Sequence, residues 1–266
     1  MSEQRVRVDV SGPVAEVVLS RPDKHNALDG EMFQALDAAV AQVRAATGVR
    51  VVVLHGEGAS FCSGLDVAAL TGGSGLSVED LLARAPGERA NLAQRVCIGW
   101  ADLPVPVIAA LQGSVYGGGM QIALGADIRI AAPGAKLSIM EVKWGLVPDM
   151  GITATLPRLM PADRAKELTY TARVVSGAEA AELGLVTRTA DDPLAAAREL
   201  AAQIADRSPD AVRATKRLYD AAWPGGGDAG LLLETELQTP LLGSPNQIAA
   251  VVAGMSGEPG KFTDPA

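Results

Sequence analysis

Residues 113–127 read GSVYGGGMQIALGAD, and this stretch carries the strongest structural signal in the chain. The glycines at 117–119 follow a short apolar run and open a predicted helix that reaches Gly125. Glycines at the start of a helix leave backbone N–H groups accessible at the positive end of the helix dipole, where an oxyanion can approach. A turn packed tightly against a neighbouring strand would use the same residues. The run lacks the lysine of a phosphate-binding loop and the spacing of a dinucleotide fingerprint, so no nucleotide site is predicted.

A second segment of this kind lies upstream. Residues 60–66 read SFCSGLD, follow a glycine-rich turn at 56–58, and predict a strand-to-helix passage that could present the backbone amide of Leu65. Two amides from two loops can form an oxyanion hole, with each donor worth roughly 3–4 kcal/mol in the transition state. Carboxylate side chains would then have to move the protons.

The elements around these two segments alternate between strands and helices. An antiparallel hairpin is predicted at the N-terminus, because two alternating runs flank a Ser-Gly-Pro turn. Apolar residues recur at helical spacing from Asp29 to Ala46, with Asp29 as the N-cap. Glycine, serine and charged residues at 70–91 predict a loop beside a site. The order is a repeated β-β-α pattern. Predicted strands cover residues 6–10, 15–19, 50–55, 105–111, 127–132 and 136–140.

The pattern changes at residue 192, where consecutive helices begin. We therefore expect a core of residues 1–191 that holds the site, and a helical domain of residues 192–266 that serves assembly. The predicted helices of this second domain cover residues 193–207, 209–222, 231–242 and 245–255.

Composition limits the classes of function. Hydrophobic residues make up 48% of the 266 residues and aromatic residues only 3%, which is typical of an aliphatic α/β core. The net charge is -8, and Lys and Arg form no run longer than a pair. This pattern predicts binding neither to nucleic acid nor to an anionic membrane. The N-terminus lacks the apolar core of a signal segment, so we expect a cytoplasmic protein.

Cysteines and histidines are few. Cys62 and Cys97 have no metal-ligand spacing and form no disulfide framework, so no metal site is predicted. His25 and His55 lie beside no nucleophile motif, which disfavours a Ser-His-Asp hydrolase. We expect His25 in a solvated turn and His55 at the end of a strand.

Four ordered segments together resemble the enoyl-CoA hydratase/isomerase (crotonase) superfamily. They are RPDKHNAL at 21–28, FCSGLD at 61–66, the stretch at 113–127, and GLVP at 145–148. The resemblance implies an α/β crotonase fold, a spiral of β-β-α units with a C-terminal helical domain that builds homotrimers, often paired into hexamers. It also implies an acyl-CoA substrate with no separate cofactor.

The resemblance assigns roles to individual residues. It places the thioester oxygen on the backbone amides of Leu65 and Gly118. The residues that it implies for binding CoA and substrate are Arg21, Lys24, Ala27, Ser63, Leu65, Asp66, Gly117 and Gly118. Arg21 and Lys24 have the alternative interpretation of solvated turn cations, and Asp66 that of a cap for a helix that begins near Val67.

Three side chains bear on the reaction. Hydratases of the family carry two glutamates, and the matching positions here are Gln121 and Glu141. An amide can orient water but cannot exchange a proton at neutral pH. Asp149 stands where dienoyl-CoA isomerases of the family carry a catalytic aspartate. In those isomerases the position of Gln121 is also an aspartate, so the match is partial.

We therefore expect double-bond isomerisation of an unsaturated fatty acyl-CoA, with Glu141 and Asp149 as proton carriers and Gln121 as an orienting group. The alternative is a hydratase that adds water to a 2-enoyl-CoA. A non-catalytic acyl-CoA binder and a haloaryl-CoA dehalogenase are further possibilities, although the dehalogenase needs a suitably placed histidine.

Structural roles compete with these assignments. Glu141 could pair with Lys143 or an arginine, and Asp149 could cap a helix over 152–159. Trp144 and Met140 are expected to pack an acyl tunnel or the core.

Overall fold

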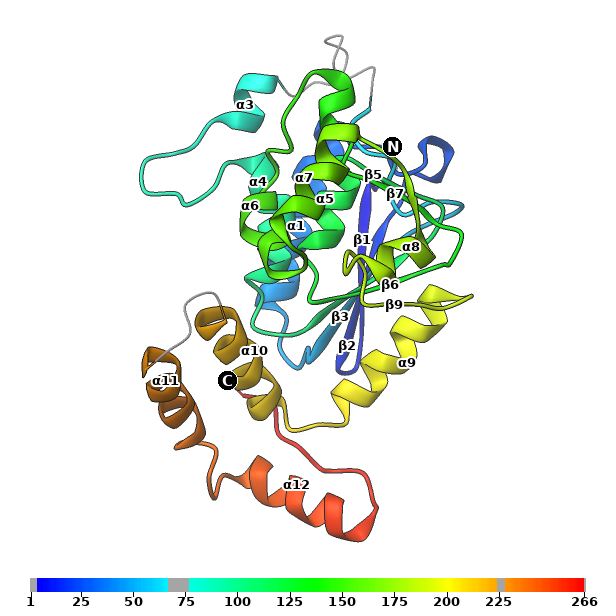
Figure 1. The fold of residues 1–266 in the computed structure, drawn as a ribbon. Coiled ribbons are helices and arrows are strands. Elements are labelled where there is room, and N and C mark those ends of the chain that lie inside the picture. The colour runs from blue at the N-terminus through cyan, green and yellow to red at the C-terminus, as the bar shows by residue number, and fades with distance from the viewer. Residues whose placement is uncertain (1–3, 67–76, 224–227, 266) are drawn as a thin grey trace.

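The computed structural model describes residues 4–66, 77–223 and 228–265. Two sheets form the centre of the molecule (Figure 1). The larger has the strand order β1-β2-β3-β4-β6-β9 and the smaller the order β5-β7-β8. The strands are β1 (Val6–Ser11), β2 (Val14–Leu19), β3 (Val51–Gly56), β4 (Val107–Leu111), β5 (Ser114–Tyr116), β6 (Ile128–Ala131), β7 (Lys136–Ser138), β8 (Val175–Ser176) and β9 (Arg188–Thr189).

The connections between strands follow the predicted β-β-α order. Strands β1 and β2 form the expected antiparallel hairpin, and every later pair in the larger sheet is parallel. The described helices are α1 (Gly30–Ala45), α3 (Val78–Leu82), α4 (Leu92–Ala101), α5 (Gly118–Leu124), α6 (Ile152–Thr155), α7 (Ala162–Thr171), α8 (Gly177–Glu182), α9 (Pro193–Ala205), α10 (Pro209–Ala222), α11 (Asp228–Gln238) and α12 (Pro245–Ser256), with 3-10 turns η1 (Pro22–Lys24), η2 (Glu141–Trp144) and η3 (Leu156–Arg158). None of the described helices is long and apolar enough to cross a lipid bilayer.

The burial of strand β3 shows that the larger sheet is covered on both faces. All six of its residues are buried, as expected for a parallel strand with helices on each side. Its side chains alternate between the faces. Val52 and Leu54 pack into the main core with α1, α4 and α5, whereas Val51 and Val53 pack against α9. Figure 1 shows these two layers on opposite sides of the sheet.

Helix α9 belongs structurally to the cover of the sheet. Ala197, Ala201 and Ala205 recur every fourth residue, so they lie on one face of the helix and allow close packing on β3, β4 and β6. The predicted domain boundary at residue 191 therefore falls before a helix that packs on the core. The three helices that follow, α10, α11 and α12, extend away from the sheet (Figure 1).

The predicted loop at 70–91 contains a short helix. Helix α3 begins after Ser77, which forms a reciprocal capping box with Asp80. The sequence did not predict this helix, because five residues are too few to show a helical period of apolar residues. Residues 70–76 of the predicted loop lie outside the described residues.

Candidate active site

The two glycine-containing segments lie side by side. The Cys62 N–H donates to the Ser114 carbonyl at 3.1 Å, and the Tyr116 N–H donates to the Cys62 carbonyl at 3.0 Å. These bonds form a parallel bridge between residues that are far apart in sequence. The bridge pairs Cys62 with Val115. Three residues after Cys62 the chain reaches Leu65, and three residues after Val115 it reaches Gly118.

The amides of Leu65 and Gly118 have no acceptor in the part of the chain that the structure describes. The Leu28 N–H donates to the Gly64 carbonyl at 2.8 Å, and the Asp66 N–H donates to the Leu28 carbonyl at 3.0 Å. Since N–H groups alternate in direction along extended chain, the Leu65 N–H faces away from Leu28. Neither the Leu65 nor the Gly118 N–H donates a hydrogen bond to any described residue, and both residues line one cavity.

The glycines at 117–119 fit both interpretations of this run: an accessible helix N-terminus and a turn packed tightly against a neighbouring segment. Gly117 has φ 51°, which favours glycine, and its own N–H donates to the Ser138 carbonyl at 3.0 Å. A Cβ on Gly119 would lie 2.5 Å from the Cys62 carbonyl oxygen, so this residue allows α5 to pack on the neighbouring segment. Tight packing and an accessible helix N-terminus therefore coexist.

The cavity has a volume of about 340 Å³. Its wall is mainly apolar, and the ionisable side chains among its described residues are Glu141 and Asp149. Trp144 and Met140 both line the cavity, and Trp144 is 53% exposed, so it lies at the rim and not in the core. The described lining comprises Phe33, Ser63, Gly64, Leu65, Leu81, Leu82, Ala93, Gly117, Gly118, Met140, Glu141, Trp144, Leu146, Val147, Asp149 and Met150.

Glu141 is the first residue of η2, and its carboxylate is held on one side only. Its Oε1 accepts a hydrogen bond from Gln121 Nε2 at 2.6 Å. Its Oε2 is buried and has no hydrogen-bond partner among the described residues. Burial raises the pKa of Glu141, and the Asp149 charge adds to the rise, while hydrogen bonds from its own backbone and Gln121 oppose it. Pairing with Lys143 or an arginine is not found among the described residues, so that alternative is wrong.

Gln121 lies behind Glu141 and is 1% exposed. Its Oε1 accepts a hydrogen bond from the Met150 N–H at 2.9 Å. The side-chain amide thus joins η2 to the segment that leads into α6. Gln121 does not belong to the described lining of the cavity, so it contacts the Glu141 carboxylate from behind the cavity wall.

Asp149 is exposed and lines the cavity near its opening. The N-cap of α6 is Gly151, and no side chain caps this helix, so the interpretation of Asp149 as a helix cap is wrong. The structure brings Glu141 and Asp149 to one cavity, with Glu141 in its wall and Asp149 in contact with solvent.

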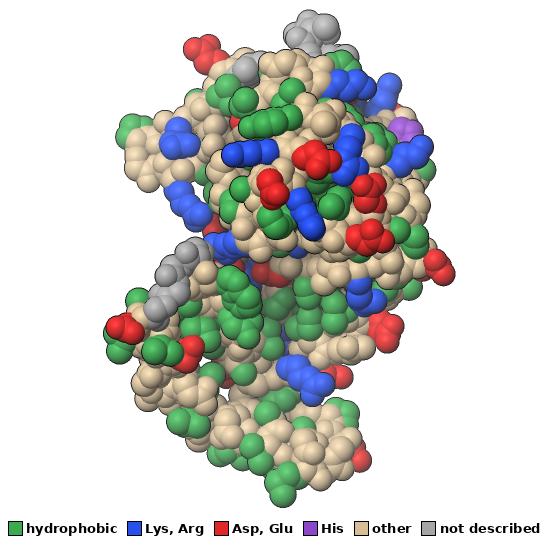
Figure 2. Space-filling model, in the orientation of Figure 1, with side chains coloured by type: hydrophobic (Ala, Val, Ile, Leu, Met, Phe, Trp, Pro, Cys, Tyr) green, Lys and Arg blue, Asp and Glu red, His purple; other side chains and the backbone are tan. Residues whose placement is uncertain are grey.

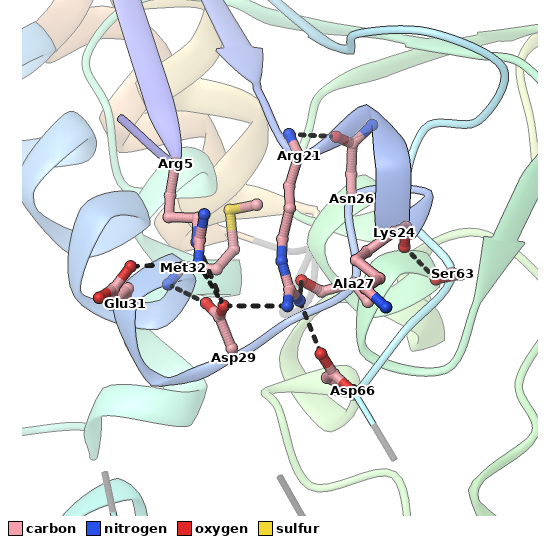
Figure 3. Close-up of polar contacts among 10 residues, drawn as sticks. All are labelled: Arg5, Arg21, Lys24, Asn26, Ala27, Asp29, Glu31, Met32, Ser63 and Asp66. Atoms are coloured by element: carbon pink, nitrogen blue, oxygen red, sulfur yellow. Dashed lines mark hydrogen bonds and ion pairs between the residues drawn. The ribbon is translucent and has the colours of Figure 1, made fainter. Parts of the chain in front are cut away.

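Arg21 occupies a network of carboxylates (Figure 3). Its guanidinium donates to the Ala27 carbonyl at 3.1 Å and pairs with Asp66 at 2.8 Å and with Asp29 at 3.4 Å. Asp29 also accepts the Met32 N–H at 2.8 Å, which confirms its predicted role as the cap of α1. The Arg21 side chain is 13% exposed, so it is not a solvated turn cation.

Lys24 differs from Arg21 because it is exposed and its ammonium has no partner among the described residues. The Ser63 hydroxyl donates to the Lys24 carbonyl at 3.3 Å, which places the lysine next to the cavity wall (Figure 3). Asp66 pairs with Arg21, and the helix predicted to start near Val67 lies outside the described residues.

The histidines and cysteines lie outside the cavity wall. His25 is exposed in a turn, as predicted, with Nδ1 3.0 Å from the hydroxyl of Ser60. Ser60 is 2% exposed and accepts a backbone N–H, so it is not presented as a nucleophile. His55 is in β3, near Glu16. Burial raises the pKa of Cys62 to about 12, which keeps it a thiol.

Sequence reasoning missed several residues of the wall. Phe33 comes from α1, Leu81 and Leu82 come from α3, and Met150 precedes α6. Only the apolar character of these positions was visible in the sequence, because nothing local shows that three separate parts of the chain meet around one space.

Comparisons with known proteins agree along nearly the whole chain. The family model described as enoyl-CoA hydratase/isomerase matches residues 9–246. YngF of Bacillus subtilis (strain 168), named as a candidate enoyl-CoA hydratase/isomerase, is 38% identical over 86% of this chain and 82% of its own length. Carnitinyl-CoA dehydratase of Salmonella typhi is 36% identical over 79% of this chain and 78% of its own.

Solved structures show the same fold. The crystal structure of an enoyl-CoA hydratase from Bacillus anthracis has a TM-score of 0.87 at 29% identity, covering 97% of this chain and 99% of that one. An enoyl-CoA hydratase from Mycobacterium tuberculosis H37Rv has a TM-score of 0.84 at 30% identity, covering 98% and 99%. The chain therefore has the crotonase fold and belongs to the enoyl-CoA hydratase/isomerase family.

Proposed function

We propose that the protein isomerises a carbon–carbon double bond of an unsaturated fatty acyl-CoA, with Glu141 as the proton carrier. One observation carries this proposal. A carboxylate whose Oε2 has no partner among the described residues lies in the wall of an apolar cavity, which is also lined by two residues whose backbone amides donate to none of the described residues. The amides can hold a developing negative charge, and the carboxylate can move a proton.

The chemistry follows from these groups. The thioester oxygen of a 3-enoyl-CoA would accept hydrogen bonds from the Leu65 and Gly118 amides. The Glu141 carboxylate would remove a proton from C2, and the electron pair would delocalise over the thioester oxygen and C4 as a dienolate. Return of the same proton to C4 would leave the double bond between C2 and C3. A carboxyl group whose pKa lies nearer to neutral pH than usual is suited to both steps.

The assignment of Gln121 favours isomerisation over hydration. Water addition to a 2-enoyl-CoA needs one group that removes a proton from water and a source of a proton for C2. Gln121 cannot exchange a proton at neutral pH, and both ends of its side chain are already bonded. A 1,3-proton shift needs only the carboxylate that is present.

We assign Asp149 a second proton-carrying role. It lines the same cavity as Glu141, so it could return a proton to a carbon further along a conjugated dienoyl chain. Its exposure would let it exchange protons with solvent.

Hydration, or the reverse dehydration, is the second candidate reaction. The relatives' names include hydratases and a carnitinyl-CoA dehydratase, which supports this alternative. Asp149 at the rim could then hold the attacking water, with Glu141 as the proton donor to C2.

An absorbance assay separates the two reactions. Isomerisation of a 3-enoyl-CoA creates a conjugated enoyl thioester and raises the ultraviolet absorbance, whereas hydration of a 2-enoyl-CoA lowers it. We expect a rise with 3-enoyl-CoA that Glu141→Gln abolishes. Rapid loss of absorbance with 2-enoyl-CoA and no reaction of 3-enoyl-CoA would establish the hydratase instead. Binding without turnover of either thioester would identify a non-catalytic binder.

We also propose that the C-terminal helices assemble the chain into a homotrimer or a hexamer. Leu232 of α11 is 72% exposed and Met255 of α12 is 85% exposed, and hydrophobic side chains gather on this helical part of the surface (Figure 2). Exposed apolar surface of this kind favours association. Light scattering should give a mass of three or six chains for the wild type. Leu232→Glu should lower that mass, whereas Val10→Glu, at an exposed position of β1, should not. A monomeric wild type would contradict the proposal.

A further inference from the structure

We infer that a small cavity between the end of α1 and α10 binds a phosphate-sized oxyanion. The cavity has a volume of about 140 Å³, and its described wall comes from the end of α1, the turn at 46–49, the segment 103–105, Arg213 of α10 and Pro265. None of these described residues lines the active-site cavity. The inference is therefore independent of the proposed reaction.

Two arginines line this cavity, and neither charge is balanced. Arg44, in the last turn of α1, is exposed, and its guanidinium forms no hydrogen bond or ion pair with any described residue. Arg213 donates from Nη2 to the Val49 carbonyl at 3.3 Å, whereas its Nε is buried and has no hydrogen-bond partner among the described residues. Like charges repel, and a buried donor without an acceptor costs free energy. An anion in the cavity would relieve both costs.

Negative groups near the cavity do not cancel these two charges. Asp264 borders the cavity, because its Oδ2 would lie 3.6 Å from a Cβ on Gly48, but its Oδ1 already accepts a hydrogen bond from Arg50 Nε. The described residues of the wall include no Asp or Glu. The C-terminal end of α1 contributes the equivalent of about half a negative charge, which is less than two guanidinium charges. The local charge therefore favours an anion.

Backbone donors add to the two guanidinium groups. Thr47, Gly48 and Val49 line the cavity, and their N–H groups donate to none of the described residues. Guanidinium and successive backbone N–H groups are the donors that bind phosphate and sulfate in proteins. A water takes about 30 Å³, so 140 Å³ gives space for about four oxygen-sized groups, as a tetrahedral oxyanion requires.

A bound anion would connect α10 to the core. Pro209 is the one buried residue of α10, so polar contacts contribute much of the attachment of this helix. Lys216 donates to the Val105 carbonyl at 3.0 Å and pairs with Asp127 at 2.7 Å. An anion held between Arg213 and the turn at 46–49 would add a second polar connection, and α10 should then separate from the core less often.

Calorimetry and thermal unfolding of the full chain test the inference without any acyl-CoA. Inorganic phosphate is added in a buffer free of other oxyanions, and sodium chloride at equal ionic strength serves as the control. We expect saturable binding of one phosphate per chain. The Tm should rise by about 3 °C or more at about ten times Kd, because a ligand of the folded state stabilises it. Chloride should bind without saturation, and equal effects of the two salts would contradict the inference.

Three variants identify the residues that bind the anion. Arg213→Gln and Arg44→Gln should each weaken phosphate binding about 10-fold or more, because each loses a charged donor. Arg44 is exposed and unpaired among the described residues, so Arg44→Gln should also keep the stability of the wild type in chloride. Arg217→Gln is the matched control, since Arg217 is an exposed residue of α10 that pairs with Glu236. Phosphate affinity equal to that of the wild type in both cavity variants would overturn the inference.

Hydrogen exchange locates the anion, and CoA tests its source. Saturating phosphate should slow amide exchange at 46–50 and 209–222 in the wild type but not in Arg44→Gln. Unchanged exchange at both segments would contradict the site. CoA should bind the wild type and Arg44→Gln with equal affinity, because this cavity is separate from the active site. Loss of CoA binding in Arg44→Gln would assign the cavity to a phosphate of CoA and overturn the inference of a free anion.

Discussion

The carboxylate of Glu141 packs against the backbone of Gly117. A Cβ on Gly117 would lie 3.4 Å from Glu141 Oε1. Gly117 directly precedes Gly118, whose N–H donates to none of the described residues, so the start of α5 holds the Glu141 carboxylate close to this amide. The predictions below follow from this arrangement.

Glu141→Gln should remove catalysis and keep binding. Glutamine has nearly the same shape and can still accept the Gln121 N–H, but it cannot take up a proton. We expect kcat to fall by about 100- to 10,000-fold, while calorimetry finds acyl-CoA binding unchanged. Glu199→Gln, on the exposed side of α9, serves as the control. An active Glu141→Gln protein would exclude Glu141 as the base.

The same substitution should stabilise the fold at neutral pH. Burial raises the pKa of Glu141, so this carboxyl group stabilises the fold only while it is protonated. That contribution is complete below the unfolded pKa of about 4.3 and is lost as the pH rises through the higher folded value. Urea unfolding at neutral pH should therefore give a larger free energy of unfolding for Glu141→Gln than for the wild type. The difference should shrink as the pH falls to about 4. Lower stability of the variant at neutral pH would contradict this prediction.

Gly118→Ala should damage the oxyanion hole. The added Cβ would lie 2.8 Å from Leu28 Cδ1 and 2.8 Å from Met150 Sδ, so either these side chains or the start of α5 must shift. We expect kcat to fall by about 100- to 1,000-fold, because a donor in an oxyanion hole depends on its position. Gly134→Ala is the matched control, since its Cβ would meet nothing within 4 Å. Equal activity of the two variants would argue against an essential amide at residue 118.

Arg21 and Lys24 should separate into structural and binding roles. Arg21→Ala removes the cation that pairs with Asp66 and one of the two that pair with Asp29, so we expect a loss of about 1–3 kcal/mol in the free energy of unfolding. Lys24→Ala should leave stability unchanged and raise KM for the CoA thioester. This increase in KM should be smaller at high salt, because salt screens the lysine charge in the wild type. Chemical denaturation and steady-state kinetics measure the two effects. If Arg21→Ala raised KM and kept the stability of the wild type, Arg21 would have a binding role and not a structural one.

The sequence predicted the elements that depend on local patterns. The N-terminal hairpin follows from alternation over 6–19, and α1 follows from helical spacing after Asp29. The two glycine segments could be recognised because glycine marks backbone that approaches other backbone closely, and such positions allow few replacements. The cavity forms where these segments meet.

Other features depend on contacts between distant residues and could not be predicted in this way. The bonds of Gln121 to Glu141 and Met150 join three elements, and no local pattern reveals them. The resemblance implies that Arg21 contacts CoA, and no local pattern revealed that it also pairs with carboxylates supplied by a helix cap and by the residue after Leu65. Helix α9 was grouped with the C-terminal helices because its periodicity does not show which surface it covers.

Isotope incorporation tests the proposed chemistry most directly. The purified protein is incubated with a 3-enoyl-CoA in water enriched in deuterium and oxygen-18, and the product is analysed by mass spectrometry and NMR. A proton shift through Glu141 predicts a conjugated 2-enoyl-CoA that carries no oxygen-18 and keeps at C4 the proton taken from C2, and predicts no product with Glu141→Gln. A 3-hydroxyacyl-CoA labelled with oxygen-18 at C3 as the main product would contradict the isomerase assignment.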